Sequence, residues 1–350
     1  MTLEQAVGLA LTLLFLADVF LTVLYARAGT GLLAQYWDRA IWTVLRIVAR
    51  QSGSKGGVVQ SFAGPMIVVL LIAFWAVGLT IGAALVIRPD LGTAIRPSSG
   101  GTQHDFVTAL LVAGNSLSIV GSGGGYSPQT TGTRLLFLAN SLIGASVLSL
   151  VLSYLVQVYS ALRERNALAL TIDLMTGGTG EAAEMLARLM PEGDCSNAAS
   201  ALDSLVQPLA ATKEAHHFYP LLFYFRFEEP LYSVSRFSFV LLDLTTLIES
   251  ILDRRQYGAL VNAAPVKSLR EAAMLLLETL DRHLPAASNR STDAARTWND
   301  RNDYIAASEI LTRTGITARP DGFDRYVAAR GAWEPLVRRV AARLHDPACA

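Results

Sequence analysis

The sequence predicts an all-α membrane protein with three transmembrane helices, a short re-entrant segment and an all-helical cytoplasmic domain. Charge is the first reason. Residues 1–160 hold 13 of the 58 Asp, Glu, Lys and Arg residues, which is about 8% of that half, against about 24% in residues 161–350. Second, three apolar runs reach the roughly 20 residues that cross a bilayer as a helix. Third, a fourth apolar run is too short to span and ends in glycines.

The first span occupies residues 6–26 of a peripheral segment, residues 1–30, and Asp18 interrupts it. An intramembrane carboxylate is a candidate for ion attraction, proton sensing or pairing with an Arg. We favour a structural role, in which a hydrogen bond to a neighbouring Thr or Ser fixes how this span docks. A signal peptide over residues 1–28, ending at Ala26-Arg27-Ala28, is the rival interpretation. The acidic Glu4 and the long apolar run argue against it.

Residues 31–60 form a basic loop that contains an amphipathic helix over residues 32–50. Its apolar residues recur at helical spacing, and the opposite side carries Arg39, Arg46 and Arg50. This pattern suits the membrane interface, and equally a helix packed on the soluble domain or on a neighbouring subunit. The excess of basic residues places the loop in the cytoplasm. The N-terminus is then outside, and the charged half of the chain is cytoplasmic.

Residues 61–165 are predicted to be a pore domain, with an outer helix over residues 62–87, a pore helix and filter over residues 105–125, and an inner helix over residues 134–162. A short helix that begins near Asp105 and stops at glycines directs its negative end into the membrane. The glycines let the backbone turn its carbonyl groups to one side. Such carbonyls can replace the hydration shell of a cation.

The stretch Ser118-Ile119-Val120-Gly121-Ser122-Gly123, with Pro128 after it, resembles the T-T-V-G-Y-G filter of the two-span, pore-loop potassium channel family. The resemblance covers residues 61–165. It implies a homotetramer in a lipid bilayer that conducts K⁺ or Na⁺ and needs no other cofactor. Ile119, Ser122 and Gly124 replace the family's second Thr, its Tyr and its Asp. These departures weaken the innermost ion site and the bracing of the filter, so the choice between K⁺ and Na⁺ stays open.

Two other interpretations of the glycine-rich stretch remain. It is either a plain extracellular loop or a phosphate-binding loop. A phosphate-binding loop requires a preceding strand and usually a following Lys or helix N-terminus, and the sequence has neither here.

The inner helix carries a polar stripe at steps of three and four residues, formed by Ser146, Ser149, Ser153, Gln157 and Ser160. A polar stripe is costly against lipid, so we expect it to face a partner helix or water. The resemblance implies that these residues line the inner pore and that Gly144, 21 residues after Gly123, is a gating hinge. Close packing of small residues at Gly144 is the structural alternative.

Residues 166–350 are predicted to be an all-helical cytoplasmic domain, with helical spacing over residues 168–174, 181–189, 198–209, 238–252, 268–284, 293–311 and 334–344. Breaks are expected at Gly177-Gly178 and at several prolines, including Pro208. Residues 218–227 are the one aromatic-rich run with an extended character. The apolar run at residues 237–251 contains Asp243 and Glu249, so a buried helix is favoured over a fourth span.

No ligand motif in this half is strong. Glu214, His216 and His217 do not have metal-ligand spacing, and Gly177 to Gly180 is better explained as a helix cap than as an anion site. No catalytic arrangement stands out, so we expect no enzyme activity. The formal net charge of zero gives no nucleic-acid signature.

The sequence therefore predicts a subunit of a tetrameric cation channel in the inner membrane, whose cytoplasmic domain responds to an unidentified ligand or protein. The alternatives are a non-conducting scaffold or signalling subunit with the same layout, and a membrane enzyme.

Overall fold

A computed structural model gives the fold and describes residues 2–25, 31–51, 61–99, 101, 104–118, 125–283, 300–319 and 321–344. The chain divides into two compact units. The N-terminal unit comprises Met1–Val48 and Ala63–Val158, and the C-terminal unit comprises Ala49–Phe62 and Tyr159–Ala350. Three described helices are long and apolar enough to cross a membrane: α1 (Leu3–Val23), α4 (Ala63–Ile87) and α6 (Thr131–Met175). The three predicted spans are confirmed as helices of this kind.

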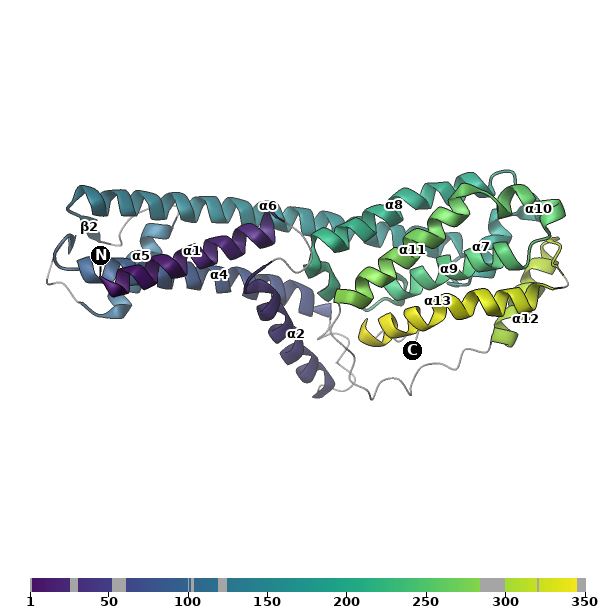
Figure 1. Ribbon diagram of the computed structural model, residues 1–350, viewed down its shortest axis with the longest axis horizontal. Helices are drawn as coiled ribbons and strands as arrows, with labels where there is room; N and C mark the ends of the chain where they lie inside the picture. Colours follow the sequence, from purple (N-terminus) through teal and green to yellow (C-terminus); the bar gives the residue numbers. More distant parts are fainter. Residues whose placement is uncertain are drawn as a thin grey trace. The chain divides into compact units, whose positions relative to one another are not determined.

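In the N-terminal unit, α1 lies lengthwise along α4 (Figure 1). Thr2 and Gln5 form a capping box that starts α1, and Glu4 pairs with Arg88 just after α4 at 2.8 Å. The two helices meet through small residues. A Cβ at Gly8 would lie 2.6 Å from the carbonyl oxygen of Gly82, so no larger side chain fits there. Backbones approach this closely in membranes where small residues line the seam.

Helix α5 (Phe106–Leu117) is the short apolar helix of this unit and packs against α4. Its 12 residues rise about 18 Å, which is too short for a hydrocarbon core of about 30 Å. Strands β1 (Ile95–Pro97) and β2 (Tyr126–Pro128) flank it in sequence and pair antiparallel, with Arg96 opposite Ser127. The short strand pair therefore joins the chain before α5 to the chain that follows the glycine-rich stretch.

Helix α6 extends well beyond the predicted inner helix. It begins at Thr131 and ends at Met175, so residues 168–174 are its last turns and not a separate helix. A Schellman cap ends it: Gly177, at φ +69°, donates its N–H to the Leu174 carbonyl, and Gly178 donates to the Asp173 carbonyl. The predicted break at Gly177-Gly178 is thus confirmed.

The C-terminal unit is a helical bundle around α9 (Val234–Ser250), as Figure 1 shows. The surrounding helices are α7 (Ala182–Leu189), α8 (Ala198–Phe218), α10 (Arg254–Val261), α11 (Ala264–His283), α12 (Asp300–Arg313) and α13 (Gly322–Leu344). Most of α9 is buried, which confirms the buried helix predicted over residues 237–251.

Two expectations for this unit were wrong, and one helix was missed. Pro208 does not end a helix, because α8 continues through it to Phe218. The carbonyl freed at Ser204 lies on an exposed residue, where water can satisfy it. Residues 218–227 are not a strand, since Pro220–Tyr224 is a 3-10 helix. Helix α10 was not predicted at all; Asp253 caps it by accepting the Arg255 N–H at 2.9 Å.

Candidate functional site

The filter is predicted from the sequence to follow directly after α5. Ser118 caps the helix, donating its N–H to the Gly114 carbonyl and its hydroxyl to the Asn115 carbonyl at 2.6 Å. The remaining predicted filter residues, Ile119, Val120, Gly121, Ser122 and Gly123, lie outside the described residues, as does Gly124. The described residues resume at Gly125.

Gly125 is held by the loop that precedes α5. Its carbonyl accepts both the backbone N–H and the hydroxyl of Ser98, at 2.7 and 2.9 Å. Gln129 donates its N–H to the Ala94 carbonyl at 2.8 Å, at the other end of the strand pair. Both ends of the segment from 119 to 124 are therefore fixed, one on α5 and the other on the strand pair.

A buried hydrogen bond ties α5 to α6. The Nδ2 of Asn140 donates to the Oγ of Ser116 at 3.0 Å, and Ser116 in turn donates to the Ala113 carbonyl at 2.8 Å. Both residues are buried. Polar side chains bridge membrane helices in this way because hydrocarbon offers no other partner. The sequence reasoning missed this pair, although Asn140 was visible as a lone amide in an apolar run.

Gly144 lies against the last residue of α5. A Cβ at this position would overlap the carbonyl oxygen of Leu117, so only glycine permits the approach. Helix α6 is continuous through Gly144. The structure thus gives this glycine a packing contact, while its role as a gating hinge stays a prediction.

The predicted polar stripe lies open on α6. Ser146, Ser149, Ser153 and Gln157 are exposed, and Ser160 is half-buried beside Glu164, whose carboxylate it contacts at 3.4 Å. The buried face of α6, with Val151, Tyr154 and Val158, is on the opposite side of the helix. Among the described residues, the four exposed members of the stripe are left uncovered.

Asp18 is fully buried and joins three segments of the N-terminal unit. Its Oδ1 accepts the backbone N–H groups of Leu33 and Ala34 at 2.7 and 3.3 Å, and its Oδ2 accepts the indole N–H of Trp75 at 2.8 Å. Leu33 and Ala34 begin α2 (Ala34–Gln51), the helix predicted over residues 32–50. Asp18 therefore links α1 to the start of α2 and to α4, through backbone N–H groups and an indole in place of the expected Thr or Ser. The structural role favoured from the sequence stays a prediction.

Arg165 is a buried cation on α6. Its guanidinium reaches the carbonyls of Leu222 and Phe225 at 3.4 to 3.5 Å and lies over the ring of Phe227. No carboxylate pairs with it in the part of the chain that the structure describes. His216 is buried nearby and bonds the Thr212 carbonyl through Nδ1 at 2.8 Å. Burial lowers the pKa of His216 to about 3, and the charge of Arg165 adds to this shift.

A second buried polar cluster links α9, α12 and α13. Tyr326 donates its hydroxyl to Asp243 at 2.8 Å, and Arg330 donates to the Tyr326 oxygen. Arg330 also pairs with Asp303 at 2.9 Å and with Glu334 at 3.4 Å. Burial raises the pKa of Asp243 to about 6, against the opposing attraction of Arg330. This cluster was absent from the sequence analysis, because Asp243 and Asp303 are far from α13 along the chain.

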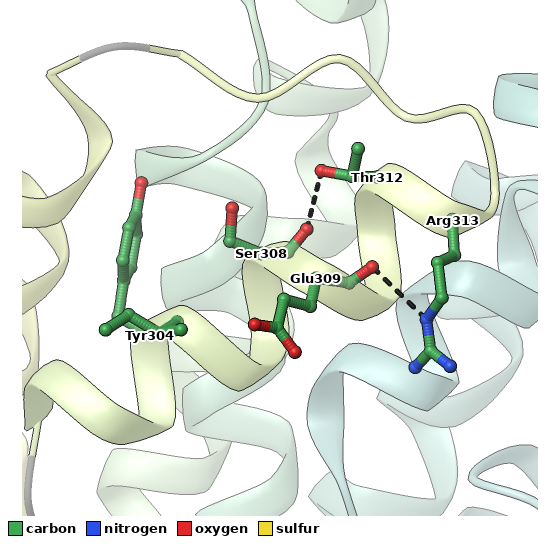
Figure 2. A pocket seen from close by; sticks show the side chains of 6 residues that line it. Tyr304, Ser308, Glu309, Thr312 and Arg313 are labelled. Carbon is green, nitrogen blue, oxygen red and sulfur yellow. Dashed lines mark hydrogen bonds between the residues drawn. The ribbon is translucent and has the colours of Figure 1, made fainter.

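The C-terminal unit also has a shallow surface depression of about 590 Å³ on α12 (Figure 2). Thr312 donates to the Ser308 carbonyl at 2.7 Å, and Arg313 donates to the Glu309 carbonyl at 3.4 Å. All of its lining residues come from this one helix. The described residues also contain no group of three or more His, Cys, Asp or Glu placed to bind a metal ion.

No family model, no curated protein and no solved structure matches this chain. The fold and the geometry above are therefore the basis on which its function is argued.

Proposed function

We propose that the protein is one subunit of a tetrameric, monovalent-cation channel of the pore-loop type. The observation that supports it best is the anchoring of α5. This helix is too short to span, lies between two helices that are long enough, and is tied to α6 through Ser116, Asn140 and Gly144. Both ends of the glycine-rich segment after it are fixed. A carbonyl-lined filter requires this type of support.

The open polar stripe on α6 supports the tetramer. In the most apolar stretch of α6, only 17% is buried within the chain, whereas the corresponding share for α4 is 44%. Four copies around an axis would place Ser149, Ser153 and Gln157 toward a water-filled cavity. Such a cavity removes the cost of polar side chains facing lipid.

The proposed orientation places the N-terminus outside and the C-terminal unit in the cytoplasm, with the bacterial-type inner membrane as its location. Both cysteines of the chain, Cys195 and Cys349, belong to the C-terminal unit. A membrane-impermeant maleimide should label neither of them in intact spheroplasts and should label Cys195 after permeabilisation. A cysteine introduced at Gly101, a position with open space around it, should react without permeabilisation. The reverse labelling pattern would refute the orientation.

The C-terminal unit is proposed to bias the gate in response to an unidentified ligand or protein. Arg165 supports this role, because it binds the Leu222 and Phe225 carbonyls directly to the helix that carries the polar stripe. A displacement of this segment would act on the inner helix without an intervening linker.

Ion flux into liposomes tests the proposal. Purified protein should pass K⁺, Na⁺ or both, and Gly121→Ala should reduce the flux to the background of empty liposomes. Gly132→Ala is the matched control, since a Cβ at Gly132 meets no atom within 4 Å. Mass measurement should give four copies per particle. Absence of flux for both ions over a range of voltage and pH, with the tetramer intact, would favour a non-conducting scaffold.

A further inference from the structure

The start of α2 is docked on α1 and α4 by a small set of directional contacts. Asp18 accepts its first two free N–H groups, as described above. One turn later, Trp37 donates its indole N–H to the Leu70 carbonyl at 3.2 Å and stacks on Phe74 with ring centroids 4.5 Å apart. The outer face of α2 is apolar and exposed at Tyr36, Val44 and Ile47. The first turn therefore holds the helix to the N-terminal unit.

Asp38 follows within this docked turn, four residues after Ala34. Its Oδ1 is shielded from solvent and has no hydrogen-bond partner among the described residues. The hydroxyl of Thr22, one turn after Asp18 on α1, is shielded and without a partner in the same way. Asp18 is close enough to repel a second negative charge at Asp38. The Oδ1 of a carboxylate in this position therefore has neither water nor a donor to stabilise it, although the side chain as a whole is half-buried.

The described residues of the neighbouring elements supply no compensating cation. Helix α4 carries no charged residue between Ala63 and Ile87, and the part of α6 in the same apolar cluster, Val147 to Leu155, carries none either. On α1 the titratable group facing this turn is Asp18. On α2 itself Arg39 is exposed, and no ion pair joins Asp38 to a basic residue in the described ranges. Burial, together with the charge of Asp18, raises the pKa of Asp38 to about 8.

We propose that Asp38 is a proton-binding site that couples pH to the docking of α2: the protonated carboxyl permits the docked turn, and loss of the proton releases it. Asp38 ionises readily once α2 has left the buried site, so docking and proton binding are linked. Docking is therefore strongest below about pH 4, the ordinary pKa of this carboxyl in the released helix. It weakens by about tenfold for each pH unit between that value and the docked-state pKa of about 8, and changes little at higher pH. The inference does not depend on ion conduction.

Thiol accessibility in the full chain tests this proposal, in nanodiscs and with Cys195 and Cys349 replaced by Ser. Ala34→Cys reports docking, because Ala34 is 2% exposed beside Asp18. Ala40→Cys, exposed on the same helix, corrects for the ionisation of the thiol itself. The ratio of the two maleimide rates should rise by up to about tenfold per pH unit between about pH 4 and about pH 8, and level off above about pH 8. In Asp38→Asn, which imitates the protonated carboxyl, the ratio should stay low and flat.

Infrared difference spectra between about pH 6 and about pH 10 give a second readout that a failure of the cysteine variants does not affect. The wild type should lose a protonated-carboxyl band on alkalinisation, and Asp38→Asn should lack that change. An accessibility ratio that is flat in the wild type, or that rises equally in Asp38→Asn, would overturn the proposal. So would loss of the same protonated-carboxyl band on alkalinisation in Asp38→Asn.

Discussion

The carbonyl oxygen of Leu117, in the last residue of α5, lies directly against Gly144 of α6, at a distance that leaves no space for a Cβ. Alanine in a helix interior is ordinarily more stable than glycine by about 0.5–1 kcal/mol. The contact reverses this preference, because a methyl group at 144 must push α5 away. Whether alanine at position 144 stabilises or destabilises the protein therefore shows whether α5 and α6 are in contact there.

We expect Gly144→Ala to destabilise the protein by about 1–3 kcal/mol, the usual cost of overpacking. Gly132→Ala, on the same helix with open space around it, should be neutral or slightly stabilising. Thermal unfolding of the purified protein in detergent measures both variants. A stabilising Gly144→Ala would show that α5 and α6 are not in contact there.

The Asn140–Ser116 hydrogen bond should appear as a coupling energy in a double-mutant cycle. Asn140→Leu and Ser116→Ala each remove one partner, and the double variant removes both. We expect each single change to cost about 1–2 kcal/mol and the pair to be coupled by about 0.5–1.5 kcal/mol. Unfolding in detergent again provides the measurement. Strict additivity would mean that the two side chains do not interact.

Asp18→Asn should loosen α2 and α1 at once, because an amide nitrogen cannot accept the N–H groups that the carboxylate accepts. We expect a loss of about 2–4 kcal/mol and a lower yield of assembled protein. Trp75→Phe removes only the indole N–H and should cost about 1–3 kcal/mol. If the assembled fraction passes the same ion current as the wild type, Asp18 is structural; altered selectivity with normal assembly would give it a role in conduction.

Much of the N-terminal unit follows from sequence alone. The lengths of the long apolar runs predict helices α1, α4 and α6, and the short apolar run after Asp105 predicts α5. The partners of Asp18 do not follow, because Trp75 is 57 residues away and the pairing depends on how α1 packs on α4. The hydrogen bond between Ser116 and Asn140 could not be predicted either. One hydroxyl and one amide in apolar runs do not show which faces of α5 and α6 pack together.

The C-terminal unit shows where local rules fail. Gly177-Gly178 ends α6 as predicted, because two consecutive glycines there adopt positive φ. Pro208 was expected to end α8, yet tertiary packing of Leu205 and Leu209 in the core outweighs one lost hydrogen bond. The Asp243, Tyr326 and Arg330 cluster arises from the packing of separate helices, which no periodicity encodes.

The titration of Asp243 should make the stability of the protein depend on pH. Its pKa of about 6 lies above the ordinary 3.8, so folding favours the protonated carboxyl. That contribution is complete below about pH 4, and it is lost as pH rises through about 6. The difference amounts to about 3 kcal/mol, at about 1.4 kcal/mol per pKa unit. Melting temperatures from pH 4 to 7 should fall for the wild type relative to Asp243→Asn, and parallel curves would contradict the assignment.

Arg330→Met should destabilise the C-terminal unit by about 3–5 kcal/mol, because it removes the cation beside the buried carboxyl of Asp243 and leaves Glu334 with Arg338 alone. Arg325→Met is the matched control on the same helix, since Arg325 pairs with Asp321 at an exposed position. That change should cost less than about 1 kcal/mol. Denaturant unfolding monitored by circular dichroism compares the two. Equal effects would show that the burial of Arg330 has no energetic consequence.

The bond between Asp18 and Trp75 also sets an order of events during synthesis. A ribosome adds about 5–20 residues per second, so the 57 residues that separate the two partners take roughly 3 to 11 seconds. During that interval α1 has emerged with its carboxylate, and the indole that will bind it does not yet exist. The bond that fixes α1 on α4 can therefore form only after α4 has been synthesised, so the carboxylate of the first helix is without its indole partner throughout that interval.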